Sequence, residues 1–143
     1  MVSLLDTNVL VYRYDPRDPG KMRVATELLR EGIVNNSLRV PHQAVVEFMA
    51  AVTRPIGGGP PLLSSEEARR ESEEILLQFP VLYPNEAVVR AALRGMATYQ
   101  LSWFDAHILA YADHYGLAEI LSEDFQHGRW YGSVRVTNPF VES

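Results

Sequence analysis

Short apolar runs alternate with longer amphipathic stretches along most of this chain. Five runs have the length and apolar character of strands: Val2–Leu5, Leu38–Pro41, Val81–Tyr83, Glu119–Ser122 and Val134–Val136. Stretches with helical periodicity or capping residues lie between them and predict five helices: Lys21–Asn35, His42–Arg54, Ser64–Phe79, Asn85–Tyr99 and Ser102–Gly116. Strands that alternate with helices favour parallel pairing. The pattern therefore predicts a single α/β domain, residues 1–143, with a central parallel sheet in a three-layer α/β/α sandwich.

Composition narrows the class of protein without identifying a partner. A hydrophobic content of 47% and a charged content of 22% are ordinary for a soluble globular domain. The sequence has no apolar run of about 18 residues and no signal-peptide pattern, so no membrane association is expected. The absence of cysteine rules out disulfides and fits a cytoplasmic location. A net charge of −5 argues against nucleic acid, but the balance is close to neutral if four acids form a metal site.

The first candidate acid, Asp6, follows the first apolar run directly and precedes Thr7 and Asn8. A carboxylate at the carboxyl end of a central parallel strand lies where open α/β sheets build their sites. The alternative interpretation is that Asp6 or Thr7 only caps the helix that follows. The residue alone does not separate a site from a cap, so the rest of the chain has to decide.

The second candidate is Glu47, the only charge between Ala44 and Val52. Val46 and Ala50 share its side of the predicted helix, so we expect a helix that is apolar nearly all round and therefore buried. A buried carboxylate must be neutralised, paired or bound to a metal. Plain exposure to solvent is the alternative, because the main apolar stripe of the helix lies on its opposite side.

The third and fourth candidates, Asp105 and Asp124, lie late in the chain. Asp105 belongs to a helix in which Phe104, Ile108 and its neighbours predict burial, although Ser102 and Asp105 also match a helix-capping box. Asp124 follows the strand predicted at Glu119–Ser122 by one residue, and Glu123 beside it competes for any role. Asp124 and Asp6 become neighbours if their two strands are adjacent in the sheet.

Taken in order, these motifs resemble the PIN-domain nucleases. The resemblance is carried by Asp6-Thr7-Asn8, the lone Glu47, Asp105 in W-F-D-A-H-I-L-A, and the ending L-S-E-D-F-Q-H-G. The resemblance covers essentially the whole chain. Within the family, the chain is most similar to the VapC-like toxins of bacterial toxin–antitoxin pairs. Each motif is weak alone, but four acids in matching order and context are fairly specific.

The resemblance implies a metal-dependent endoribonuclease. It implies a Mg²⁺ or Mn²⁺ site made by Asp6, Glu47, Asp105 and Asp124, and an oxygen-only set suits such hard cations better than zinc. We expect Asp6, Asp105 and Asp124 to bind metal directly, and Glu47 to bind metal or orient water. Thr7 or Asn8, and Ser122, match positions that orient the acids in the family. Glu123 departs from the pattern and has no assigned role.

The same resemblance implies partners. It predicts an RNA substrate, a homodimer and a small antitoxin whose tail lies across the cleft near the acidic helix Ser64–Phe79. An acidic cleft needs a cationic inhibitor, and an arginine can satisfy carboxylates with two hydrogen bonds. The nuclease interpretation also allows a housekeeping RNA-processing enzyme instead of a toxin.

Other functions fit the residues less well. A phospho-acceptor domain needs a late lysine, but Lys21 is the only lysine, and an aspartate-nucleophile phosphatase needs an acid where Asn8 stands. A non-catalytic binding module stays open. His107 and His127 have no assigned role. Three arginines could contact substrate phosphates, although an arginine more often forms a salt bridge; they are Arg13, Arg54 and Arg129.

Overall fold

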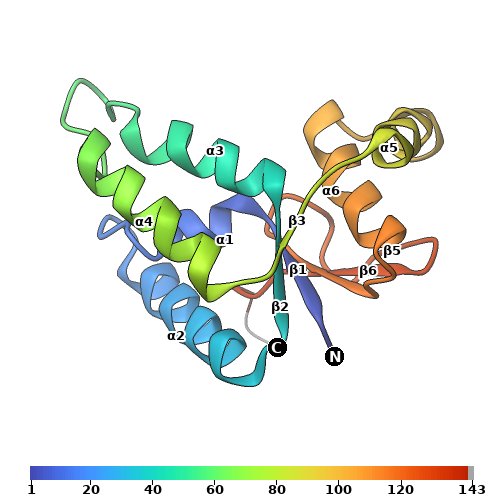
Figure 1. The fold of residues 1–143 in the computed structure, drawn as a ribbon, viewed down its shortest axis with the longest axis horizontal. Helices are drawn as coiled ribbons and strands as arrows, with labels where there is room; N and C mark the ends of the chain where they lie inside the picture. The colour runs from blue at the N-terminus through green and yellow to red at the C-terminus, as the bar shows by residue number, and fades with distance from the viewer. Residues whose placement is uncertain (142–143) are drawn as a thin grey trace.

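A six-stranded sheet forms the centre of the protein in the computed structural model, which describes residues 1–141 (Figure 1). The strands are β1 (Ser3–Leu5), β2 (Leu38–Pro41), β3 (Val81–Leu82), β4 (Glu119–Leu121), β5 (Trp130–Tyr131) and β6 (Val134–Thr137). Their order is β3-β2-β1-β4-β6-β5, and every neighbouring pair is parallel except β5 with β6. The predicted α/β architecture is confirmed, and β1 and β4, which precede two of the candidate acids, are adjacent.

Helices cover both faces of this sheet and complete the three layers. They are α1 (Thr7–Tyr12), α2 (Pro19–Asn35), α3 (His42–Thr53), α4 (Ser65–Gln78), α5 (Glu86–Tyr99) and α6 (Trp103–His114). Helices α1 to α4 lie on one side of the sheet and α5 and α6 on the other (Figure 1). Leu4 and Leu5 are both fully buried and point to opposite faces, each into the core of its own side. Within residues 1–141, no helix combines the length and apolar character needed to cross a membrane.

The helix boundaries follow the capping residues in the sequence. Ser64 accepts a hydrogen bond from the Glu67 N–H, and the Glu67 side chain accepts one from the Ser64 N–H, which completes a capping box at α4. Asn85 and Ser102 cap α5 and α6 in the same way, each accepting from a backbone N–H three residues on. The helix that carries Asp105 therefore begins where the sequence predicts.

One strand and one burial argument differ from expectation. The two-residue strand β5 reverses onto β6 through a tight turn that Gly132 makes possible with a φ of 62°, and two residues carry too little pattern to be predicted. Helix α3 was expected to be buried on all sides, but it is not, because Val46 is 57% exposed and Ala50 is exposed. Phe104, at the start of α6, is 63% exposed. Helix α3 therefore leaves one face open, whereas the expected burial of α6 holds beyond its first turn, because Ala106 and the stretch from Ile108 to Ala112 are buried between the sheet and α5.

Candidate active site

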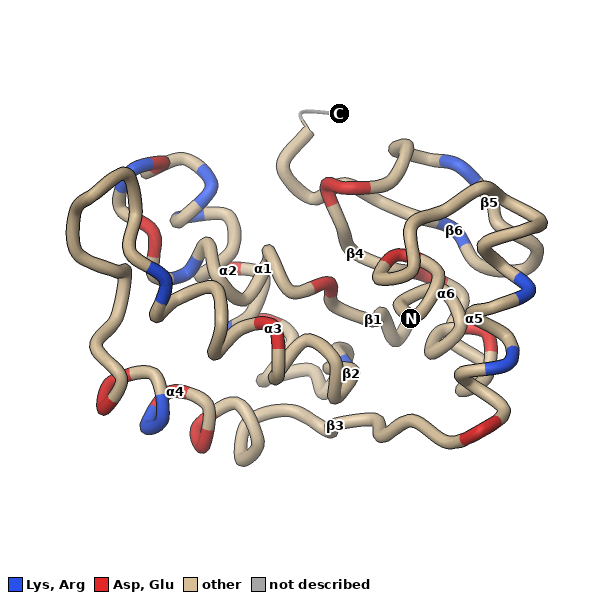
Figure 2. Tube along the Cα trace, turned by 90° about the horizontal axis from the view of Figure 1, so that it is seen from above, with Lys and Arg blue, Asp and Glu red and all other residues tan. Residues whose placement is uncertain are grey.

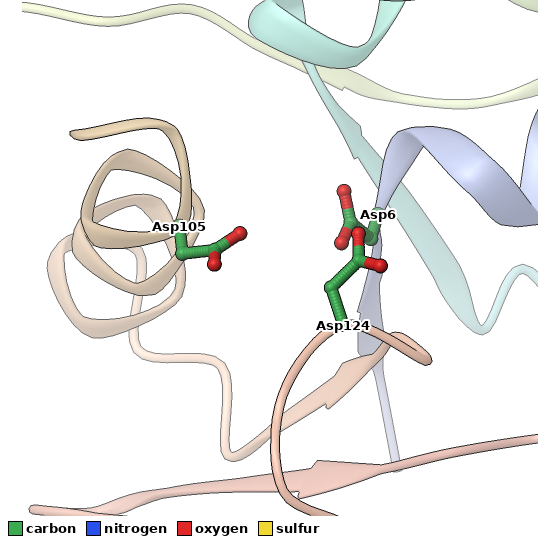
Figure 3. A group of neighbouring side chains, drawn as sticks. All are labelled: Asp6, Asp105 and Asp124. Carbon is green, nitrogen blue, oxygen red and sulfur yellow. The ribbon is translucent and has the colours of Figure 1, made fainter. Parts of the chain in front are cut away.

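Three of the four candidate acids lie together at the carboxyl edge of the sheet. One carboxylate oxygen from each of Asp6, Asp105 and Asp124 lies within 4.8 Å of the others, and the three side chains point toward one another (Figure 3). Leu5 of β1 pairs in parallel with Leu121 of β4, which places Asp6 beside the turn that carries Asp124. Asp105 reaches the same point from the first turn of α6, in the opposite helical layer.

Asp6 serves both as the helix cap and as part of this cluster. Its Oδ1 accepts a hydrogen bond from the Thr7 N–H at 2.7 Å, while Oδ2 accepts one from Ser122 Oγ at 2.6 Å. Only 5% of the residue is exposed. Burial above all, with smaller contributions from the charges of Asp124 and Asp105, raises the pKa of Asp6 from 3.8 to about 7, against the opposing effect of the Ser122 hydrogen bond. Asp6 is therefore poised to lose its proton near neutral pH.

The pKa values of the other two acids of the cluster are also raised. Partial burial raises the pKa of Asp105, and the neighbouring charges of Asp124 and Glu47 add to that effect. Partial burial also raises the pKa of Asp124, with the adjacent Glu123 contributing next. Three carboxylates this close cannot all stay ionised without a counter-charge. The cluster therefore favours either a shared complement of protons or a bound cation.

Glu47 lies outside the three-acid cluster but lines the same cavity, which has a volume of about 310 Å³. Each of its two carboxylate oxygens accepts a hydrogen bond, Oε2 from Thr7 Oγ1 at 2.5 Å and Oε1 from Gln43 Nε2 at 2.9 Å. Gln43 also donates to the Phe104 carbonyl at 3.1 Å, which ties α3 to α6 across the cavity. Sequence reasoning missed Gln43, although its position four residues before Glu47 on a helix was a usable signal.

The polar residues expected to orient the acids each contact one of them. Thr7 donates to Glu47, Ser122 donates to Asp6, and Asn8 Nδ2 donates to Asp124 Oδ2 at 3.0 Å. Ser122 Oγ also accepts from the Asp124 N–H at 3.1 Å, so one hydroxyl links two acids of the cluster. Short polar side chains thus hold three of the four acids, Asp6, Glu47 and Asp124, in the way that metal sites use neighbouring hydrogen bonds to orient their ligands.

A family model of the PIN domain matches residues 3–131, nearly the whole chain. The chain belongs to the PIN-domain family. The three acids that converge on one point all lie within the matched residues. No curated protein sequence is significantly similar to the chain.

Solved structures share the fold of this PIN domain at low sequence identity. The FitAB complex bound to a DNA fragment matches with a TM-score of 0.73 and 22% identity, over 100% of this chain and 98% of that one. A toxin–antitoxin complex from Klebsiella pneumoniae matches with a TM-score of 0.68 and 18% identity, over 96% and 97%. The Mycobacterium tuberculosis toxin VapC20, which cleaves the sarcin–ricin loop, matches with a TM-score of 0.63 and 13% identity, over 85% and 88%. At these identities the likeness establishes the fold.

Both histidines and two of the three arginines noted in the sequence contact residues outside the acid cavity of this PIN domain. His107 contacts the Trp103 carbonyl at 2.8 Å, and His127 Nδ1 accepts from the Asn138 N–H at 3.0 Å. Arg13 donates to the hydroxyl of its neighbour, Tyr14, at 2.8 Å, and Arg129 stacks over the Tyr131 ring at 4.6 Å. Arg54 alone of the three arginines considered lines the acid cavity.

The cluster fits a hard divalent cation. Oxygens bound to one octahedral Mg²⁺ lie about 3–4.2 Å apart, so the three oxygens, now within 4.8 Å of one another, can close around one ion by side-chain rotation. All three donors are carboxylate oxygens, and the chain has no cysteine that would select a softer metal. Glu47 lies outside this set of three oxygens.

Proposed function

We propose that this PIN domain is a Mg²⁺- or Mn²⁺-dependent endoribonuclease and the toxin of a VapBC-like toxin–antitoxin pair. The observation that carries the proposal is the convergence of Asp6, Asp105 and Asp124 from three separate elements onto one point of a cavity. A purely structural acid cluster would be destabilising, because burial and mutual repulsion raise the pKa values of all three carboxyl groups. A cation that binds them removes that penalty.

Each acid has a distinct part in the proposed site. Asp6, Asp105 and Asp124 hold the ion, which when bound supplies polarisation of the phosphate and acidification of water. Glu47, held through both oxygens by Thr7 and Gln43, faces the cavity as a fixed acceptor that orients the attacking water. Asn8 and Ser122 keep Asp124 and Asp6 in place. No side chain acts as a covalent nucleophile.

Arg54 supplies a positive charge for substrate at the edge of the same cavity. It is exposed and lines the cavity together with the four acids, yet within residues 1–141 it forms no ion pair. A guanidinium that stays free beside several carboxylates is available for a phosphate, which it binds with two parallel hydrogen bonds. We assign Arg54 to a phosphate of the substrate.

The choice of RNA and of a toxin role rests on the relatives. VapC20 cleaves the RNA of the sarcin–ricin loop, and the Klebsiella pneumoniae relative is part of a toxin–antitoxin complex. We extend both properties to this chain, and with them a cytoplasmic location, a small antitoxin and a homodimer. Exposed apolar side chains on α3, α5 and α6, among them Val46, Val89 and Phe104, line one groove beside the acid cavity and support a protein partner there.

The antitoxin tail was expected to cross the cleft near the acidic helix α4, but α4 does not lie at the cleft. No residue of α4 lines the acid cavity within the described part of the chain. Figure 2 shows α4 at the outside of the molecule, with α3 between it and the end of β1. Ile75 is fully buried, whereas Leu77 is 80% exposed. An antitoxin tail that crosses the acids would therefore approach over α3 and α6, with α4 as an outer contact.

Cleavage of a labelled RNA by the purified protein tests the proposal. We expect cleavage of single-stranded or looped RNA with Mg²⁺ or Mn²⁺, none in EDTA, and loss of activity in Asp124→Asn. The matched control is Asp113→Asn, an exposed acid on α6 away from the cluster. Full activity in EDTA that added metal does not raise would overturn the mechanism. A fully active enzyme that is harmless when expressed and binds no protein encoded by a neighbouring gene would favour a role in RNA processing over that of a toxin.

A further inference from the structure

Glu123, the acid beside Asp124, is held by two side chains from the other end of the chain. Its Oε1 accepts a hydrogen bond from the Tyr12 hydroxyl at 2.5 Å, and its Oε2 accepts one from Lys21 Nζ at 2.7 Å. Lys21 Nζ also contacts the Tyr12 hydroxyl at 3.3 Å. Glu123 does not line the acid cavity. The carboxylate is therefore accounted for outside the metal cluster.

This group, which we call the Glu123 clamp (Tyr12, Lys21 and Glu123), joins three elements. Tyr12 is the last residue of α1, Lys21 lies in the first turn of α2, and Glu123 lies in the turn after β4. Lys21 Nζ stands 4.9 Å from the centre of the Tyr12 ring and 5.6 Å from that of Phe140, and the two rings meet edge to face. The side chains of Lys21 and Glu123 are only 33% and 18% exposed, so the clamp is largely shielded from water.

The clamp fixes the backbone that carries Asp124. On one side Glu123 is tied to α1 and α2, and on the other Phe125 is buried in the core. Between these two anchors the Asp124 side chain points into the cavity, where it meets Asp6 and the amide of Asn8 (Figure 3). Asp124 is the most exposed member of the cluster, and so it has the least packing of its own to hold it.

We propose that Lys21 and Tyr12 are positioning residues of the metal site, which clamp Glu123 and thereby hold Asp124 in the orientation that binds the ion. The inference rests on the proposed metal site. It also gives the only lysine of the chain a function. An ordinary surface ion pair contributes little to stability and nothing to a remote ligand. A positioning role therefore predicts an effect on metal affinity that a surface ion pair lacks.

Titration of the full-length protein with Mn²⁺, followed by electron paramagnetic resonance, tests the clamp without any assay of activity. Lys21→Met should weaken Mn²⁺ binding at least fivefold, and Lys21→Arg should restore most of the loss because it can still donate to Glu123. The matched control is Arg30→Met, which breaks the Arg30–Glu27 ion pair on the exposed face of the same helix. That variant should stay within twofold of the wild type.

Two further variants separate positioning from loss of charge. Glu123→Gln keeps an acceptor for Lys21 and should retain most of the affinity, whereas Glu123→Ala should match Lys21→Met. The double variant Lys21→Met/Glu123→Ala should be no weaker than either single variant, because all three break the same clamp. If Lys21→Met impairs folding, Tyr12→Phe removes one hydroxyl and should still weaken binding about two- to threefold.

The possible failures are distinguishable. If Lys21→Met and Tyr12→Phe both bind Mn²⁺ within twofold of the wild type while Asp124→Asn loses binding, the clamp is only structural and the inference is wrong. If Lys21→Met/Glu123→Ala binds Mn²⁺ like the wild type while Lys21→Met alone does not, Lys21 acts by neutralising Glu123, which also overturns positioning. If the wild type binds Mn²⁺ no more tightly than Asp124→Asn, the proposed metal site itself fails.

Discussion

Replacing Asp6 by asparagine should stabilise the metal-free protein while abolishing its activity. The folded state raises the pKa of Asp6 from 3.8 to about 7, mainly through burial. Below about pH 4 the carboxyl group is protonated in both the folded and unfolded states, so it costs nothing. As the pH rises toward 7 the unfolded state loses its proton first, and folding stability falls through that window. Above pH 7 the full cost is present.

The size of the effect follows from the shift. At 1.36 kcal/mol for each pKa unit, ionised Asp6 destabilises the metal-free fold by about 4 kcal/mol at pH 8. The Asp6→Asn variant avoids that cost but weakens the hydrogen bond from Ser122 Oγ, which is worth about 1–2 kcal/mol. The net gain is about 2 kcal/mol, or roughly 5–8 °C in Tm for a domain of this size.

Thermal unfolding in EDTA at pH 5 and pH 8 measures this directly. We expect Asp6→Asn to unfold well above the wild type at pH 8 and close to it at pH 5, whereas Asp113→Asn, an exposed acid on α6, should shift little at either pH. Saturating Mn²⁺ should reverse the order, because an ion present at 100 times its Kd stabilises a binding-competent fold by about 2.7 kcal/mol. A variant that is no more stable than the wild type at pH 8, or equally stabilised at both pH values, would refute the reasoning.

The remaining predictions concern activity, pH and partners. Asp105→Asn, Asp124→Asn and Glu47→Gln should each lower kcat at least 100-fold in an RNA cleavage assay while circular dichroism stays unchanged; an effect of Glu123→Gln as large as that of Asp124→Asn would contradict the assignment. Arg54→Ala should raise KM about tenfold with little change in kcat, and Arg54→Lys should recover part of the loss; an unchanged KM would exclude phosphate contact. The affinity for Mn²⁺ should fall as pH drops below about 7, since binding must displace the proton of Asp6; isothermal titration at pH 6 and pH 8 checks this, and equal affinities would oppose it. Expression of the protein alone should be toxic, and Asp6→Asn should relieve that toxicity. Co-expression with the neighbouring small gene should yield a complex that does not cleave RNA, whereas harmless expression of the wild type would oppose the toxin role.

The sequence by itself determined the architecture and the identity of the candidate acids. Alternating apolar runs and capped helices predicted five of the strands and their helical crossovers, because local periodicity and caps are read within a few residues. Parallel pairing predicted that Asp6 and Asp124 would be neighbours if β1 and β4 were adjacent, and the structure shows that these strands are adjacent. Capping residues marked three helix starts, because each side chain accepts a hydrogen bond from the backbone N–H three residues further on; these residues are Ser64, Asn85 and Ser102.

Only the tertiary structure decided how the acids are grouped and which side chains hold them. Glu47 was expected to be buried because its helix lacks other charges, yet Val46 beside it is exposed, and burial depends on which face of α3 meets the sheet. The separation of Glu47 from the three-acid cluster, its support by Gln43, and the capture of Glu123 by Lys21 involve side chains that come from different elements. Glu123 and Lys21 are 102 residues apart in the chain, and no local pattern encodes a contact at that separation. Packing of the whole domain brings such pairs together, so their chemistry becomes visible only in the fold.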